Sequence, residues 1–146
     1  MSNAIPTLTY AQLRERVEAL ARQIEAPSSL LPTYATSQDF ARPHIEVDSR
    51  GYHYVVVERG EELSRTTTHA IDELFYCVFR DVTFSIACSF ELSNRKPAQD
   101  SRRILFAHNL QLLGSLSSAW RARREAELVT VLSAHPFCDT VDAHAT

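Results

Sequence analysis

Glycine is scarce in this chain, with three glycines among 146 residues. Phosphate-binding loops and nucleophile elbows are built on glycine, and neither a P-loop nor a G-x-S-x-G motif occurs. Six histidines are present, but none forms an HxxxH or HExxH pair of the kind that binds zinc. We therefore predict no catalytic residue, no cofactor and no metal site.

Long apolar runs are also missing. The longest candidate, residues 75–90, is interrupted by Arg80 and Asp81, whereas a transmembrane helix needs about 20 apolar residues. Residues 1–9 lack the basic start and apolar stretch of a secretory signal. The three cysteines are odd in number and form no CxxC pair, which is typical of small buried side chains in a reducing compartment. These absences predict a cytoplasmic protein.

What is present suits an ordinary globular protein, because 45% of the residues are hydrophobic and 23% are charged. A chain of this length can form one core, so we expect a single domain over residues 1–146. Its core is expected at about residues 9–134, followed by a flexible tail at 135–146. Residues 95–124 hold seven basic residues and one acidic residue, but no aromatic side chains alternate with them as in nucleic-acid stacking surfaces. We therefore predict no nucleic-acid partner.

The spacing of apolar residues changes along the chain. Helical spacing begins after Thr9, for which Gln12 is a capping-box partner, and ends near Pro27. Residues 44–59 instead alternate in the manner of a β-hairpin, with a turn at Ser49–Arg50–Gly51. An isolated hairpin is marginally stable, so it must pack on helices or gain another strand, for which residues 61–67 are a candidate.

Helical spacing returns after Thr68, the expected N-cap of a long helix at about 69–92. A second helical region is expected at about 100–134, bent near Gly114 or the serines after it. The predicted fold class is therefore α+β and predominantly helical, with a β-hairpin or small antiparallel sheet packed against long α-helices.

The stretch at residues 55–65, VVVERGEELSR, passes from valines directly into charged residues. Neighbouring residues of a strand point to opposite faces, so Glu58 and Arg59 cannot pair with each other and each needs a separate partner. We interpret these charges as a structural clamp that fixes the hairpin to the following helix. The predicted ion-pair network contains Glu58, Arg59, Glu62, Arg65, Asp72 and Asp100. A catalytic carboxylate pair among Glu58, Glu61 and Glu62 stays open as an alternative.

The same stretch also carries a family resemblance. YHYVVVERGEELSR, then IDELFYCVF, then DSRRILFAHNLQLLGSL, resembles the immunity protein 63 family of bacterial polymorphic toxin systems over roughly residues 44–120. The resembling positions are a strand ending in Glu-Arg-Gly-x-Glu with a downstream Arg, a helix that begins with Asp, and Asp-x-Arg-Arg before Phe. In this chain they are Glu58, Arg59, Gly60, Glu62, Arg65, Asp72, Asp100, Arg102, Arg103 and Phe106.

The resemblance implies a small cytoplasmic protein that binds and neutralises a cognate toxin domain by forming a stoichiometric complex, without a cofactor. The acidic residues Glu61, Glu62 and Glu73 are then candidates for contact with a basic partner. Two alternatives stay open on the sequence alone. One is an α+β adaptor or chaperone-like binding protein, and the other is a small enzyme with a carboxylate site.

Overall fold

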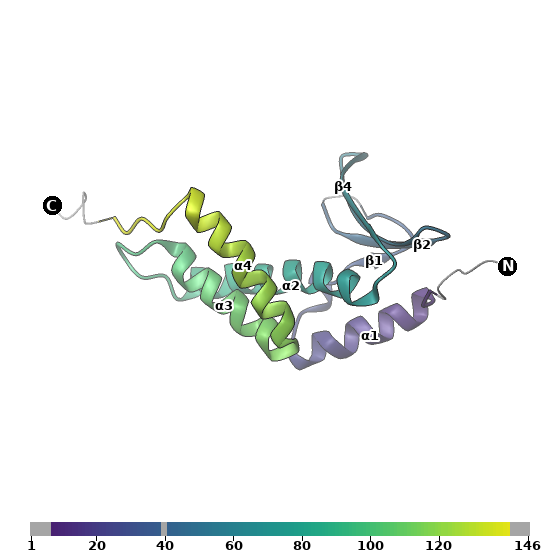
Figure 1. Ribbon diagram of the computed structural model, residues 1–146, viewed down its shortest axis with the longest axis horizontal. Helices are drawn as coiled ribbons and strands as arrows, with labels where there is room; N and C mark the ends of the chain where they lie inside the picture. The colour runs from purple at the N-terminus through teal and green to yellow at the C-terminus, as the bar shows by residue number, and fades with distance from the viewer. Residues whose placement is uncertain (1–6, 39–40, 141–146) are drawn as a thin grey trace. The chain divides into compact units, whose positions relative to one another are not determined.

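The computed structural model describes residues 7–38 and 41–140. The chain forms two compact units, Met1–Phe79 and Arg80–Thr146, and helix α2 (Ile71–Ser93) runs through their boundary. The first unit carries α1 (Tyr10–Gln23), a short 3₁₀ helix, η1 (Ser28–Leu30), and the strands. The second carries α3 (Ser101–Leu116) and α4 (Ser118–Ala134). The predicted α+β class with a predominance of helix is confirmed (Figure 1).

The first unit is built on a sheet with the strand order β1-β2-β3-β4 among the described residues. Its strands are β1 (Thr33–Tyr34), β2 (His44–Asp48), β3 (Gly51–Glu58) and β4 (Glu61–Thr68). β1 is parallel to β2, and the other neighbours are antiparallel. The β2–β3 hairpin therefore forms as predicted, and residues 61–68 supply the additional strand that it needs.

The turn between β2 and β3 depends on Gly51. This residue has φ of +114°, and a Cβ atom there would lie 2.6 Å from the carbonyl oxygen of Thr68. Asp48 closes the same turn by accepting the N–H of Arg50 at 2.8 Å, the local pattern that makes aspartate frequent in turns. Only glycine combines that backbone conformation with so close a neighbouring strand.

Helix α1 is joined to the sheet by buried side chains and by two tyrosines. Leu13, Val17 and Ala21 are buried at helical spacing. The hydroxyl of Tyr10 accepts the N–H of Val47, and the hydroxyl of Tyr52 accepts the N–H of Leu8. The predicted capping box of Thr9 and Gln12 is present in both directions.

Two helix boundaries differ from the sequence-based expectation. Helix α2 begins at Ile71, so Thr68 is not its N-cap: Thr68 ends β4 and accepts the N–H of Ala70. The helical region predicted at 100–134 is two helices, because Ser117 leaves helical geometry and caps α4 by accepting the N–H of Trp120. The break therefore falls at one of the serines that follow Gly114. α3 and α4 pack against each other within the second unit (Figure 1).

Candidate functional site

The charged stretch at residues 55–65 forms the end of a β-hairpin. Strand pairing between β2 and β3 stops at His44 and Val55, so beyond the end of β2 residues 56–64 form a hairpin in which the end of β3 pairs with the start of β4. We call these residues the hairpin arm. At its base the N–H of Ala41 donates to the carbonyl of Val57. The arm turns at Arg59 and Gly60, whose φ angles are +54° and +76°, as a two-residue type I′ turn requires.

A β-bulge lies in the arm. Val56 pairs with Ser64, whereas Val57 pairs with Glu62, so Leu63 is an extra residue on β4. The side chain of Leu63 stands in solvent, at 57% exposure. The bulge also shifts the alternation of β4 by one position, which brings Glu62 to the same face of the sheet as Arg65.

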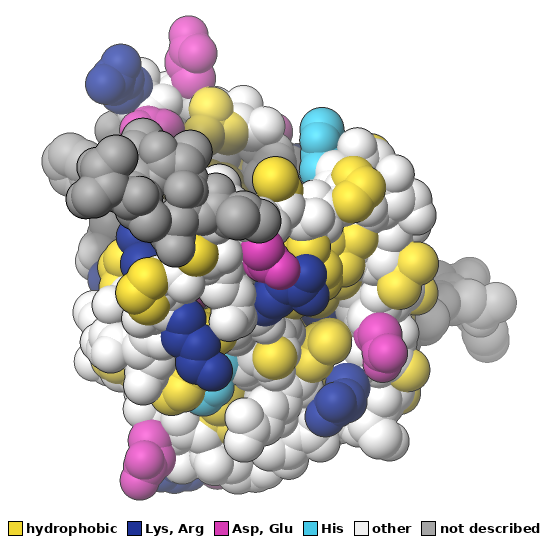
Figure 2. Space-filling model, turned by 90° about the vertical axis from the view of Figure 1, so that its left-hand side faces the viewer, with side chains coloured by type: hydrophobic (Ala, Val, Ile, Leu, Met, Phe, Trp, Pro, Cys, Tyr) yellow, Lys and Arg dark blue, Asp and Glu magenta, His cyan; other side chains and the backbone are white. Residues whose placement is uncertain are grey.

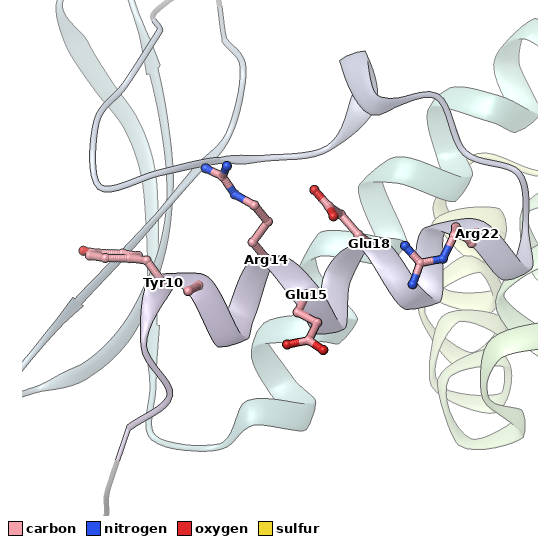
Figure 3. Close-up of a pocket in the computed structure, with 6 residues that line it drawn as sticks. Tyr10, Arg14, Glu15, Glu18 and Arg22 are labelled. Atoms are coloured by element: carbon pink, nitrogen blue, oxygen red, sulfur yellow. The ribbon is translucent and has the colours of Figure 1, made fainter.

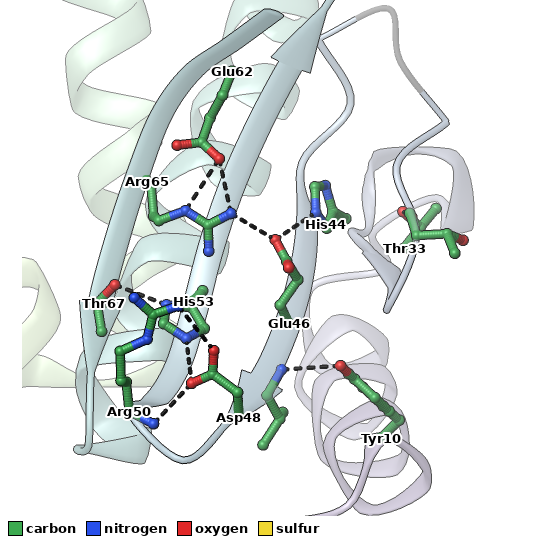
Figure 4. Close-up of polar contacts among 12 residues, drawn as sticks. Tyr10, Thr33, His44, Glu46, Asp48, Arg50, His53, Glu62, Arg65 and Thr67 are labelled. Carbon is green, nitrogen blue, oxygen red and sulfur yellow. Dashed lines mark hydrogen bonds and ion pairs between the residues drawn. The ribbon is translucent and has the colours of Figure 1, made fainter. Parts of the chain in front are cut away.

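Four side chains form a polar chain across this face (Figure 4). Arg65 donates to Glu62 at 2.8 Å and to Glu46 at 2.9 Å. Glu46 also contacts Nε2 of His44 at 3.0 Å. The guanidinium of Arg65 lowers the pKa of Glu62. The chain thus links β2 to β4 over the central strand β3, and the expected pair of Arg65 with Glu62 is present.

A second polar chain lies beside the first and is centred on His53 (Figure 4). Nε2 of His53 contacts Asp48 at 2.7 Å, and Nδ1 contacts the hydroxyl of Thr67 at 2.8 Å. The hydrogen bond with His53, followed by that from the N–H of Arg50, lowers the pKa of Asp48 to about 2. A hydroxyl, an imidazole and a carboxylate in sequence are also the parts of a hydrolase triad. His53, however, is only 1% exposed and lies within the sheet, so the arrangement serves to join three strands.

The other residues of the predicted network occupy different places. Glu58 and Arg59 are exposed at the tip of the arm, and neither makes an ion pair with any described residue. This differs from the expected clamp, because the tip lies at the end of β4 (Glu61–Thr68) that is farther along the chain from α2. Asp72 and Glu73 lie in the first turn of α2, where acidic residues favour the helix dipole. Asp100 lies in the second unit and takes part in separate contacts.

Asp100 is the N-cap of α3 and also holds the C-terminal segment. Its carboxylate accepts the N–H of Arg102 and the N–H of Cys138, both at 2.9 Å, and pairs with the Arg102 side chain at 2.8 Å. These bonds lower the pKa of Asp100 well below its usual range, with the Arg102 side chain as the largest cause. Arg102 in turn donates to the carbonyls of His135 and Pro136.

Arg103 and Phe106 complete this contact, which we call the C-terminal clasp (Asp100, Arg102, Arg103 and Phe106). Arg103 pairs with Asp139 at 3.0 Å, and its guanidinium lies 4.3 Å from the ring centre of Phe137. The ring of Phe106 is 6.2 Å from the same ring. The clasp gives residues 135–139 defined contacts, whereas residues 141–146 of the predicted tail lie outside the described part of the chain.

A cavity of about 440 Å³ lies along the exposed side of α1, lined by Tyr10, Ala11, Arg14, Glu15, Glu18 and Arg22 (Figure 3). The side chains of Arg14 and Glu18 point from α1 toward the segment that precedes β1. The Arg14 guanidinium lies 5.0 Å from the ring centre of Tyr34, and burial raises the pKa of Tyr34 to about 12. The cavity contains none of the residues predicted from the sequence.

No group of three His, Cys, Asp or Glu residues within 7–38 and 41–140 is placed to hold a metal ion. On the face shown in Figure 2, Lys and Arg side chains stand apart from one another with apolar and uncharged side chains between them. None of the described helices is long and apolar enough to cross a membrane.

Sequence reasoning missed five residues of the two polar chains: His44, Glu46, Asp48, His53 and Thr67. A signal for four of them was present, because a hairpin closed at Ser49–Arg50 places Asp48, Glu46 and His44 opposite Gly51, His53 and Val55. The partner Thr67 required the register of β4, which depends on the bulge. No signal in the sequence indicated that Asp139 would return to α3.

Comparison with known protein families gives a match. The sequence pattern of the family described as immunity protein 63 matches residues 48–130, which begin at the first hairpin turn and end within α4. No curated protein and no solved structure matches. The family match covers more than half of the 146 residues and confirms the resemblance drawn from the arm and from Asp100–Phe106. The chain belongs to the immunity protein 63 family.

Proposed function

We propose that this protein is the immunity partner of a bacterial polymorphic toxin and acts by binding the toxin domain in a stoichiometric complex. The family match over residues 48–130 carries this proposal. Immunity requires that the toxin be blocked or distorted rather than chemically changed, so one immunity molecule protects against one toxin molecule. The complex is expected to form in the cytoplasm of the cell that makes the toxin.

The described side chains favour binding over catalysis. His53, the residue most like a general base, is shielded between Asp48 and Thr67 and is only 1% exposed. A general base must come within hydrogen-bond reach of the proton that it removes. In the alternative of a catalytic carboxylate pair among Glu58, Glu61 and Glu62, Glu62 is the member whose partner is seen, and that partner is the cation Arg65.

Acidic residues are the proposed points of contact with a basic toxin domain. Residues 1–94 carry thirteen acidic and eight basic residues, and such an imbalance speeds association with a basic partner. Glu61, Glu62 and Glu73 were the candidates from the sequence. Glu61 is exposed on the arm, whereas the pairing of Glu62 with Arg65 already balances its charge.

Co-expression with the product of the adjacent gene tests the proposal. We expect the two proteins to co-purify at a one-to-one ratio and growth to be rescued in proportion to the amount of this protein. A toxin domain from an unrelated system serves as the control and should not bind. Failure to bind the neighbouring product would contradict the proposal, and protection at far less than one equivalent would favour an enzyme.

A further inference from the structure

The hairpin arm has features that its own fold does not explain. Residues 56–58 and 61–64 lie beyond the strand pairing with β2, the N–H of Ala41 supports the arm at its base through the carbonyl of Val57, and a two-stranded ribbon is marginal in water on its own. The type I′ turn at Arg59–Gly60 gives it a defined shape. A projecting ribbon of fixed shape is suited to entering a cleft of another molecule.

The arm also exposes an apolar side chain. Leu63 is the extra residue of the bulge and is 57% exposed, and Val56 and Val57 beside it are half-buried. Bulges in sheets often redirect a side chain, and at an edge strand they also hinder pairing with another strand. The bulge therefore makes the arm a poor template for strand addition, while it presents Leu63 as a separate contact.

The charges of the arm point to the chemistry of its partner. Glu58 and Glu61 lie directly opposite each other across the two strands, and like charges in that position destabilise a ribbon. Neither carboxylate has a cationic partner among the described residues. Arg65 cannot serve, because its guanidinium is bound to Glu62 and Glu46. A cationic group from another protein would relieve this repulsion.

We infer that the hairpin arm is the element that enters the toxin, with Leu63 as an apolar anchor and with Glu58 and Glu61 pairing with cationic side chains of the toxin's cleft. This inference rests on the proposed function and adds the surface and the chemistry of the partner. Glu62 stays bound to Arg65 and supports the arm from within. Leu63 then contributes mainly to the lifetime of the complex, and the two carboxylates contribute mainly to the rate of association.

The test uses the full-length protein and the toxin domain encoded by the neighbouring gene, in a catalytically inactive form. The variants are Leu63→Ser and the double variant Glu58→Gln/Glu61→Gln. We expect Leu63→Ser to raise Kd about tenfold or more through faster dissociation. The double variant should slow association severalfold and make the rate less sensitive to salt.

Matched controls come from exposed positions elsewhere. Leu92→Ser removes a leucine that is 66% exposed on α2, and Glu15→Gln/Glu125→Gln removes two exposed carboxylates from α1 and α4. These variants should bind as the wild type does. Thermal unfolding of every variant separates loss of contact from loss of fold, and hydrogen exchange of the wild type should show the amides of residues 56–64 protected in the complex.

The possible results distinguish failure of the arm's inferred role from failure of the proposed immunity function. In one result, the wild type binds the toxin while neither arm variant changes the affinity and residues 56–64 gain no protection. That result would contradict the inferred role of the arm but would leave the proposed immunity function intact. Absence of any wild-type complex would overturn both. Self-association of the free protein that Leu63→Ser abolishes would also overturn the inference, because the arm would then be occupied by a second copy of this chain.

Discussion

Single residues decide how the sheet of the first unit is held together, and Asp48 shows this most clearly. It closes the β2–β3 turn through the N–H of Arg50 and contacts the buried His53 with the same oxygen. Both bonds are made to the ionised carboxylate and favour that form. The stability that Asp48 contributes therefore depends on pH.

The pH dependence has a definite sign. The pKa of Asp48 is about 2 in the folded chain, below the value of about 3.9 in an unfolded chain. Its contribution is complete above about pH 4 and is lost as pH falls toward about 2. We expect Asp48→Asn to be less stable than the wild type at neutral pH and the difference to shrink between about pH 4 and pH 2.

Urea unfolding at a series of pH values, followed by circular dichroism, measures this difference. Glu125→Gln is the control, because Glu125 is exposed and shows no ion pair with a described residue. A stability difference between Asp48→Asn and the wild type that stays constant down to pH 2 would show that the carboxylate has no special role.

The contacts of individual side chains were also the least predictable feature of the sequence. The pairing of Arg65 with Glu62 was expected and is present, but Arg59 and Glu58 make no ion pair with described residues. An alternating pattern predicts which face a side chain occupies only while the strand stays regular. The bulge at Leu63 breaks that regularity in β4, and no residue type in the stretch predicts a bulge.

At the scale of elements, the second unit is joined by a buried polar contact among its helices. Asn109 on α3 is fully buried and donates to the hydroxyl of Thr83 on α2 at 2.7 Å. Its carbonyl oxygen accepts from Nε of Arg124 on α4 at 3.0 Å. Three helices therefore meet at one amide, which favours a single register among them.

Truncation of this amide should be costly. Asn109→Ala leaves the hydroxyl of Thr83 and the guanidinium of Arg124 without this partner and opens a small cavity, so we expect a loss of about 2–4 kcal/mol in the free energy of unfolding. Asn94→Ala is the control, because Asn94 is exposed just after α2 and its side chain bonds, among the described residues, only to the nearby carbonyl of Phe90. Chemical denaturation measures both, and equal losses for the two variants would contradict the proposed role of Asn109.

The elements themselves were largely predictable, since apolar spacing indicated both hairpin strands and every long helical region. Their boundaries were less so. Thr68 has the residue type of an N-cap, but pairing with Tyr52 keeps it in β4. Gly114 was a candidate for the bend but lies inside helix α3. A Cβ atom on Gly114 would lie 2.9 Å from Cδ of Arg121, so glycine makes room for that side chain. The break at Ser117 depends on how α4 packs against α3, and the spacing of apolar residues along the chain does not predict that packing.

At the scale of the whole molecule, the C-terminal clasp joins residues that are more than thirty positions apart. The clasp was partly visible in the sequence, because the Asp-x-Arg-Arg and Phe positions stood out in the family resemblance. The segment that these residues bind could not be predicted, because residues 135–139 have neither helical nor strand spacing. The matched family pattern ends at residue 130, so the segment held by the clasp lies beyond it.

Loss of the clasp should free the segment without unfolding the helices. Arg102→Ala removes the donors to the carbonyls of His135 and Pro136, so chymotrypsin should cut after Phe137 severalfold faster than in the wild type. Arg123→Ala, on the exposed side of α4, should leave the rate unchanged. A cleavage rate in Arg102→Ala equal to that of the wild type would show that the remaining contacts hold the segment alone.

The bulge at Leu63 also constrains how this part of the chain can change its length. One extra residue sets the side chains on the two parts of β4 out of phase, so that Glu62 and Arg65, an odd number of positions apart, share a face. Deleting one residue between them would restore regular alternation and would leave them two positions apart, still on one face of the sheet. Loss of the extra residue therefore keeps the pairing of Glu62 with Arg65, whereas a substitution at Leu63 keeps the bulge as well. The arm can thus change by one residue at the bulge without turning Arg65 to the opposite face of the sheet.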